Sequence, residues 1–176
     1  MIALDDPRWE SLRGPHGTPY DPRPALARIR SADASSEPWY ELMNELQDED
    51  EIGDVAYAAT VGLVDIAMSG RDLGPYFFGL VASTEVERHR KTSPPLPGWL
   101  EREYYTAWKH LPELALQVLR RPPNPGTFMV AMAVVALAQR QLRLGALLLS
   151  LDRPAMGDIL EEERGWKGLY REEEED

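Results

Sequence analysis

Proline divides this chain into short segments and so limits the elements that it can form. The sequence holds 15 prolines in 176 residues, and they cluster in residues 5–24, 93–98 and 122–127. Because proline lacks an amide hydrogen and clashes with the preceding helical turn, such clusters end helices and are excluded from central strands. We therefore expect a proline-rich lead-in over residues 1–24, held to the body by apolar side chains. These side chains are Trp9, Leu12 and Tyr20.

Between the breaks, apolar residues recur at helical spacing. One apolar stripe occupies positions i, i+3, i+4 and i+7, which share a face of a helix. Its residues are Trp39, Leu42, Met43 and Leu46. The helix that carries this stripe and the helix predicted after Asp54 should form a hairpin. Trp39 and Tyr57 should anchor the core of that hairpin. Because no segment keeps the period-two alternation of a half-buried strand, we predict an all-α fold. Six to seven helices should form stacked antiparallel pairs, either HEAT-like or in an irregular helical bundle.

Residues 128–138, FMVAMAVVALA, are apolar on every side. A membrane-spanning helix needs about 20 such residues, and the polar residues 139–141 interrupt the run. A helix that is apolar all round and too short to span a bilayer is typically buried in a protein core. We therefore expect a central buried helix here and no membrane partner.

The length of the chain fits one domain. We place this domain at residues 1–165, followed by an acidic, flexible tail over residues 166–176. The absence of cysteine excludes disulfides, thiolate metal sites and a cysteine nucleophile. The first residues lack the basic region and apolar stretch of a secretory signal, so we expect a cytoplasmic protein. No pattern specifies an oligomeric state.

Negative charge is concentrated in two stretches. The net charge is −11, residues 37–54 hold eight carboxylates and no Lys or Arg, and residues 158–176 hold nine carboxylates against three basic residues. An acidic molecule repels the phosphates of nucleic acids and of anionic membranes. The charge therefore argues against both, and it favours a basic protein as the partner.

The run QDEDEIGD, residues 47–54, holds five carboxylates and a glycine. Aligned with a calcium-binding EF-hand loop, it has Ile52 and Ala59 at two positions that need oxygen ligands, which excludes that site. Two interpretations stay open. The run is either a solvated turn, in which Gly53 ends one helix and Asp54 caps the next, or a surface that binds a partner. The candidate contact residues are Asp48, Glu49, Asp50, Glu51 and Asp54.

No motif of an enzyme is present. The sequence lacks a His-Glu-x-x-His zinc motif, a Gly-x-Ser-x-Gly elbow and a phosphate-binding glycine loop, so it nominates no catalytic residue, cofactor or metal. Three histidines, which we expect at the surface, are His16, His89 and His110. Catalytic groups from distant helices could still converge. The alternative is therefore a small helical enzyme or ligand-binding domain whose pocket is lined by Tyr104, Tyr105 and Trp108.

Four motifs in residues 5–70 carry a resemblance. They are DPRWxxLxGP, PYDPRPAL, WYELxxEL and GDVAYAAxxxLVxIA, and together they resemble a family of uncharacterised bacterial proteins with HEAT-like helical folds. The resemblance implies a helical interaction scaffold, and some proteins of this kind look like immunity or defence-associated factors that would neutralise a basic toxin. In that family the turn between the two helices often looks like Leu-His-His-Gln-Gly-Asp. Residues 46–54 are longer, acidic and without histidine, so any role of those histidines does not transfer.

Overall fold

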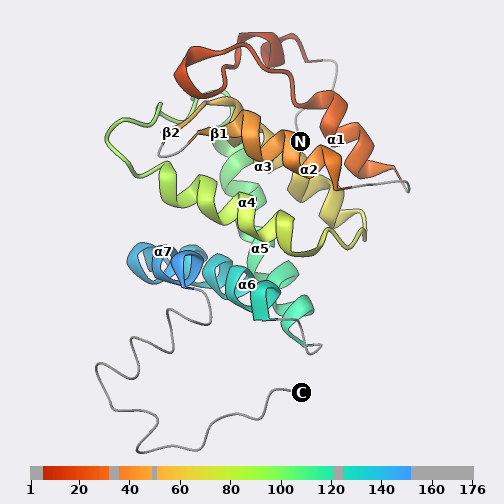
Figure 1. Ribbon diagram of the computed structural model, residues 1–176, viewed down its shortest axis with the longest axis vertical. Helices are drawn as coiled ribbons and strands as arrows, with labels where there is room; N and C mark the ends of the chain where they lie inside the picture. Colours follow the sequence, from red (N-terminus) through yellow and green to blue (C-terminus); the bar gives the residue numbers. More distant parts are fainter. Residues whose placement is uncertain (1–5, 32–35, 49–50, 121–124, 152–176) are drawn as a thin grey trace, which may run out of the picture.

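The computed structural model describes four ranges of the chain (Figure 1). They are residues 6–31, 36–48, 51–120 and 125–151. Two candidate contact residues, Glu49 and Asp50, and the expected tail over residues 166–176 lie outside these ranges. Within them the structure holds seven α-helices and one small pair of strands. The prediction of an all-α fold with six to seven helices is therefore confirmed.

The helices begin and end close to the proline-rich breaks. The 3-10 helices η1 (Pro7–Ser11) and η2 (Pro15–Gly17) form part of the lead-in. The α-helices are α1 (Arg23–Arg30), α2 (Glu37–Leu46), α3 (Val55–Met68), α4 (Gly74–Glu87), α5 (Glu101–Leu119), α6 (Pro125–Ala138) and α7 (Leu142–Ser150). Helix α5 continues through Pro112, which lies in its interior.

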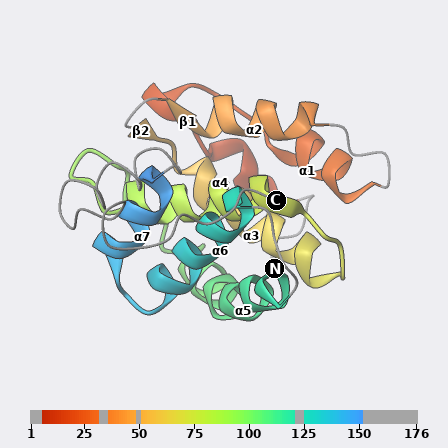
Figure 2. The same cartoon turned by 60° about the horizontal axis from the view of Figure 1, so that its bottom comes forward.

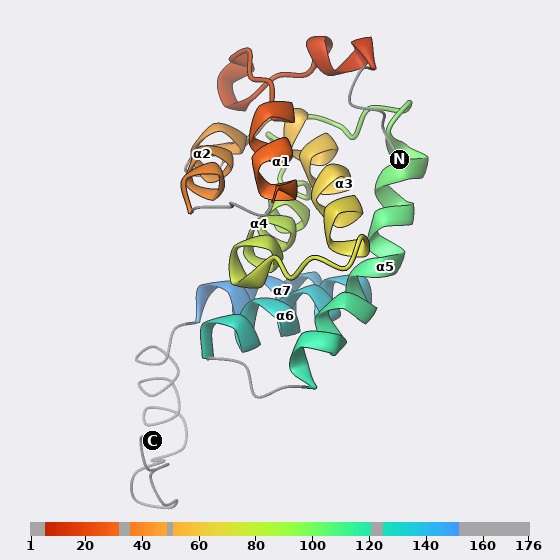
Figure 3. The same cartoon turned by 90° about the vertical axis from the view of Figure 1, so that its right-hand side faces the viewer.

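Helices pack as neighbouring pairs around α3, α4 and α6. Helix α1 contacts α2 and α3, α4 contacts α6 and α7, and α6 contacts α7. The long helix α5 packs on both α3 and α6, and Figure 3 shows it running along the side of the molecule past both. Figure 2 shows α1 and α2 on the opposite side of the molecule from α5. Among the described residues, no helix combines the length and the apolar character that a membrane crossing requires.

The most buried helix is α3, although the sequence indicated residues 128–138. Eleven of the 14 residues of α3 are buried, against six of the 14 residues of α6. Phe128 is one of the large apolar residues left exposed. Helix α3 is covered by α1, α4 and α5. Helix α6 lies at the other end of the bundle, where it packs against α4, α5 and α7 (Figure 1). Apolar composition alone did not indicate which of the two lies at the centre.

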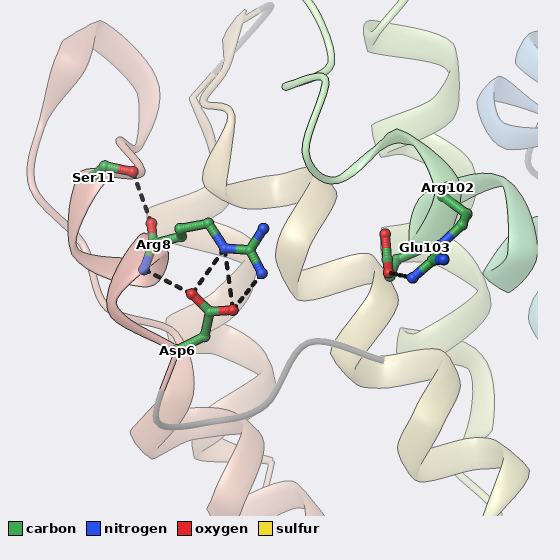
Figure 4. Close-up of polar contacts among 5 residues, drawn as sticks. All are labelled: Asp6, Arg8, Ser11, Arg102 and Glu103. Atoms are coloured by element: carbon green, nitrogen blue, oxygen red, sulfur yellow. Dashed lines mark hydrogen bonds and ion pairs between the residues drawn. The ribbon is translucent and has the colours of Figure 1, made fainter.

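The lead-in is held against the body as expected. Trp9 and Leu12 are buried, and the Tyr20 hydroxyl donates to Glu41 Oε1 at 3.0 Å. Asp6 accepts the backbone N–H of Arg8 at 2.9 Å and also holds its guanidinium (Figure 4). These bonds lower the pKa of Asp6 to about 2.

Candidate functional site

The acidic run forms a pair of strands, which we call the acidic hairpin. Strand β1 (Gln47–Asp48) pairs antiparallel with β2 (Glu51–Ile52), so that Asp48 lies opposite Glu51. A pair of like charges facing each other across a ladder is destabilising. The run between the two helices is therefore a short paired turn, in which two like charges face each other.

His16, in the lead-in, contacts both of these carboxylates. Its ring Nε2 lies 2.9 Å from Asp48 Oδ2, and its Nδ1 lies 3.0 Å from Glu51 Oε2. The His16 backbone N–H also donates to Glu51 Oε1 at 3.1 Å. Each ring nitrogen therefore meets a different carboxylate, and only the imidazolium form donates to both at once. All three side chains are exposed, so water weakens the attraction.

Asp54 does not cap α3, which corrects the expectation from the sequence. The helix has no side-chain capping bond at its first turn. Instead, Asp54 Oδ1 accepts the backbone N–H of Arg13 at 2.6 Å, and the Val55 N–H donates to the Arg13 carbonyl at 3.1 Å. Gly53 permits this approach, because a Cβ built on it would lie 2.1 Å from the Arg13 oxygen. The lead-in thus supplies the partner that a cap would have supplied.

Aromatic rings gather where α2 meets α4. Trp39 stacks on Tyr76 with ring centroids 6.2 Å apart, and Tyr40 meets Tyr76 edge-on at 5.9 Å. Trp39 is 6% exposed, whereas Tyr40 is 51% and Tyr76 is 38% exposed. The neighbouring Met43 is also exposed. Two tyrosines and a methionine therefore face solvent over a buried tryptophan.

The acidic hairpin continues directly from this part of α2. Tyr40, Met43 and Gln47 lie at i, i+3 and i+7, and the Gln47 side chain is tied to the Ser83 hydroxyl of α4 by bonds of 2.7 and 3.0 Å. We call the surface of Tyr40, Met43, Tyr76 and the acidic hairpin the α2 face. Helix α2 and the two strands lie on the side of the molecule away from α5 (Figure 2).

The three aromatic residues of the alternative pocket take different positions. Tyr105 and Trp108 line a cleft of about 710 Å³, together with residues of α4 and of the α6–α7 turn. Tyr104 is fully buried and does not line it. The Tyr104 hydroxyl donates to Glu85 Oε2 at 2.8 Å, and burial, with the nearby Glu85 carboxylate, raises the pKa of Tyr104 well above its ordinary value.

Two of the histidines had no role indicated by the sequence and yet lie at these sites. His16 bridges the acidic hairpin, and His89 lies at the wall of the cleft. The sequence held no signal for His16, because 32 residues separate it from Asp48. His110 lines a different hollow, beside α3.

Within the described ranges, no group of three or more His, Asp or Glu side chains is arranged to hold a metal ion. His16 illustrates the reason, since its two ring nitrogens meet separate carboxylates rather than a common point. The arrangement offers two chemistries: aromatic and acidic groups on the α2 face, and aromatic and basic groups in the cleft. Comparison with known protein families, with curated proteins and with solved structures found no match to this chain.

Proposed function

We propose that this chain is a non-enzymatic helical scaffold that binds a basic protein through the α2 face. The observation that carries the proposal is the exposed Tyr40–Tyr76 pair with Met43, at the helix α2 that leads into the carboxylates of the acidic hairpin. Protein interfaces combine a core rich in Tyr, Trp and Met with a polar rim, and tyrosine is among the residues that contribute most to binding. The α2 face has both parts.

The two tyrosines are already held in place. The ring of Tyr40 contacts that of Tyr76, their hydroxyls lie 3.4 Å apart, and Trp39 supports Tyr76 from the buried side. A side chain that is ordered before binding loses less conformational entropy when the partner arrives. Exposed tyrosine rings also accept Lys or Arg side chains over their faces, which suits a basic partner.

The carboxylates make the α2 face negatively charged. Asp48 and Glu51 keep exposed side chains although they meet His16, and Glu37 at the start of α2 is exposed as well, with Arg28 at 3.8 Å. Residues 37–54 contain no Lys or Arg, and His16, even when protonated, offsets only one of the two hairpin charges. Negative potential of this kind steers a basic protein and raises its association rate at low salt.

The structure refines the set of contact residues within this proposal. Asp48 and Glu51 stay in it, together with the tyrosine pair. Asp54 is bound to the Arg13 backbone and is better placed to support the acidic hairpin than to contact a partner. Glu49 and Asp50 lie outside the described ranges and stay in the set on their charge alone. A toxin neutralised by an immunity protein is one basic partner that fits this chemistry.

Capture of partners from a lysate of the source organism tests the proposal. We expect the wild-type chain to capture one basic protein at low salt, and the purified pair to bind with an affinity that falls as salt rises. The double variant Tyr40→Ala/Tyr76→Ala should lose at least about 2 kcal/mol of binding free energy. Phe128→Ala removes an equally exposed aromatic residue on α6 and serves as the control.

Charge reversal separates the rim from the aromatic core. Asp48→Lys/Glu51→Lys should lower the association rate and flatten its salt dependence, whereas Glu113→Lys, an exposed position on α5, should change neither. If the tyrosine and charge-reversal variants both bound the purified partner as the wild type does, the α2 face would not be the binding site.

A further inference from the structure

A second surface differs from the α2 face in the sign of its charge and in its shape. The cleft of about 710 Å³ opens between the end of α4, the middle of α5 and the turn that joins α6 to α7. Its size falls within the range of roughly 300 to 1,000 Å³ that is typical of small-molecule sites. Among the described residues, its basic lining residues are Arg88, Lys109 and Arg140, and its only lining carboxylate is Glu85.

The residues that line the cleft neutralise only part of its positive charge. Glu85 holds Arg88 with both carboxylate oxygens, at 2.9 and 2.6 Å, so these two charges offset each other. Within the described part of the chain, neither Lys109 nor Arg140 has a carboxylate partner. The cleft therefore presents two unpaired cations in a chain whose net charge is −11.

Arg140 occupies a backbone position that favours glycine. Its φ is 60°, in the left-handed region. The Arg140 N–H donates to the Leu137 carbonyl at 2.8 Å, and the Gln141 N–H donates to the Ala136 carbonyl at 2.9 Å. This pair of bonds closes a helix end at which glycine is the usual residue. A side chain kept in a strained backbone region is more often found where it has a function, and this one lines the cleft.

The remaining lining gives the cleft an aromatic and apolar wall. Tyr105 and Trp108 contribute rings from α5, and Leu137 and Leu142 contribute aliphatic side chains. Such rings offer a flat apolar surface against which a ligand ring can pack.

We propose that this cleft binds a small organic anion in which a phosphate or carboxylate group is joined to a flat apolar body. The anionic group is held by Arg140 and Lys109, and the body lies against Trp108 and Tyr105. Charge-assisted hydrogen bonds supply the specificity for the anion, and burial of the ring supplies the rest of the affinity. This site is independent of the protein-binding function proposed for the α2 face.

Calorimetric titration of the full-length chain with 1-naphthyl phosphate tests the proposal. We expect binding that is about tenfold tighter than that of either 1-naphthol or inorganic phosphate, because each of these lacks one half of the recognised chemistry. The proposal is overturned if 1-naphthol binds as tightly as its phosphate, or if no heat of binding appears at millimolar concentrations of the phosphate.

Three variants locate the binding. Arg140→Gly and Lys109→Gln should each weaken binding of 1-naphthyl phosphate about tenfold. Arg143→Gln removes a charge from α7 at a residue that does not line the cleft and should leave the affinity within about twofold. Because glycine suits the backbone at position 140, Arg140→Gly should melt no lower than the wild type, so a loss of binding cannot be assigned to unfolding. Equal affinity of the wild type and both cleft variants would overturn the proposal.

Discussion

The α2 face and the cleft show two ways in which a folded chain acquires local charge. On the α2 face the charge is continuous in sequence, since residues 37–54 hold eight carboxylates and no Lys or Arg. In the cleft the positive charge is assembled by folding, because Lys109 comes from α5 and Arg140 from the α6–α7 turn. The net charge of −11 therefore agrees with the acidic α2 face, but it gives no indication of the basic cleft.

The two regions also differ in what supports them. The acidic hairpin depends on the lead-in, through His16 and Arg13. The cleft depends on helix packing and on the buried Tyr104 behind it, whose ring meets that of Tyr57 edge-on at 5.7 Å. Changes to the lead-in should therefore affect only the α2 face, and changes to the helical core should reach both regions. The predictions below use this difference.

Truncation of the tryptophan beneath the α2 face should have the largest effect. Trp39→Ala removes a side chain that is 6% exposed and stacked on Tyr76, and it should lower the free energy of unfolding by about 3 to 5 kcal/mol. Tyr40→Ala, at an exposed neighbour, should cost less than about 1 kcal/mol. Urea unfolding followed by circular dichroism measures both. Equal losses for the two variants would show that Trp39 does not support this face.

Contact between the lead-in and the acidic hairpin should be sensitive to a single methyl group. Gly53→Ala forces a Cβ against the Arg13 carbonyl, and we expect it to lower the free energy of unfolding by about 2 to 3 kcal/mol. Gly98→Ala is the control, because no described atom lies within 4 Å of a Cβ built there. A neutral Gly53→Ala variant would show that the lead-in moves aside without cost.

Alkaline pH should weaken the region behind the cleft. Burial raises the pKa of Tyr57 from its usual value of 10 to about 12. A group whose pKa is raised in the folded state stabilises the fold fully below its unfolded pKa, and that contribution is lost as pH rises through the folded pKa. The free energy of unfolding should therefore fall between about pH 10 and pH 12. Urea midpoints across this range measure the fall, and Tyr57→Phe should reduce it.

Replacement of Arg140 should give the smallest effect on stability and the opposite sign. Arg140→Gly relieves a φ of 60°, and it should raise the free energy of unfolding by about 1 kcal/mol. Gln139→Gly, at the neighbouring position without a positive φ, should give no such gain. Thermal melting compares the two, and a lower melting temperature for Arg140→Gly would mean that the arginine side chain stabilises the fold itself.

Helical periodicity was sufficient to predict the fold class. The stripe that begins at Trp39 correctly placed α2, and three of its four residues are buried, whereas Met43 is exposed. Tyr57 is buried as expected. The proline-rich breaks marked where helices end. Periodicity could not rank the apolar helices by depth, because α3 and α6 have similar composition and each packs against three other helices, yet more residues of α3 are buried.

The candidate sites were less accessible from the sequence. Asp48 and Glu51 were named on charge, but their pairing depends on His16, which is remote in sequence. Tyr105 and Trp108 were named as pocket residues and do line the cleft, whereas Tyr104 lies buried behind it. No sequence pattern pointed to Arg140 as a residue of the cleft, because the residue that usually marks such a helix end is glycine.

An NMR titration of the full-length, ¹⁵N-labelled chain tests the division into two regions most directly. Two probes, 1-naphthyl phosphate and tetralysine, are added to separate samples. We predict that the phosphate shifts the Trp108 indole resonance and the amide of Arg140, and that tetralysine shifts the amides of Tyr40, Asp48 and Tyr76. Shifts from both probes at the same residues, or none at the Trp108 indole and on the α2 face, would contradict the account.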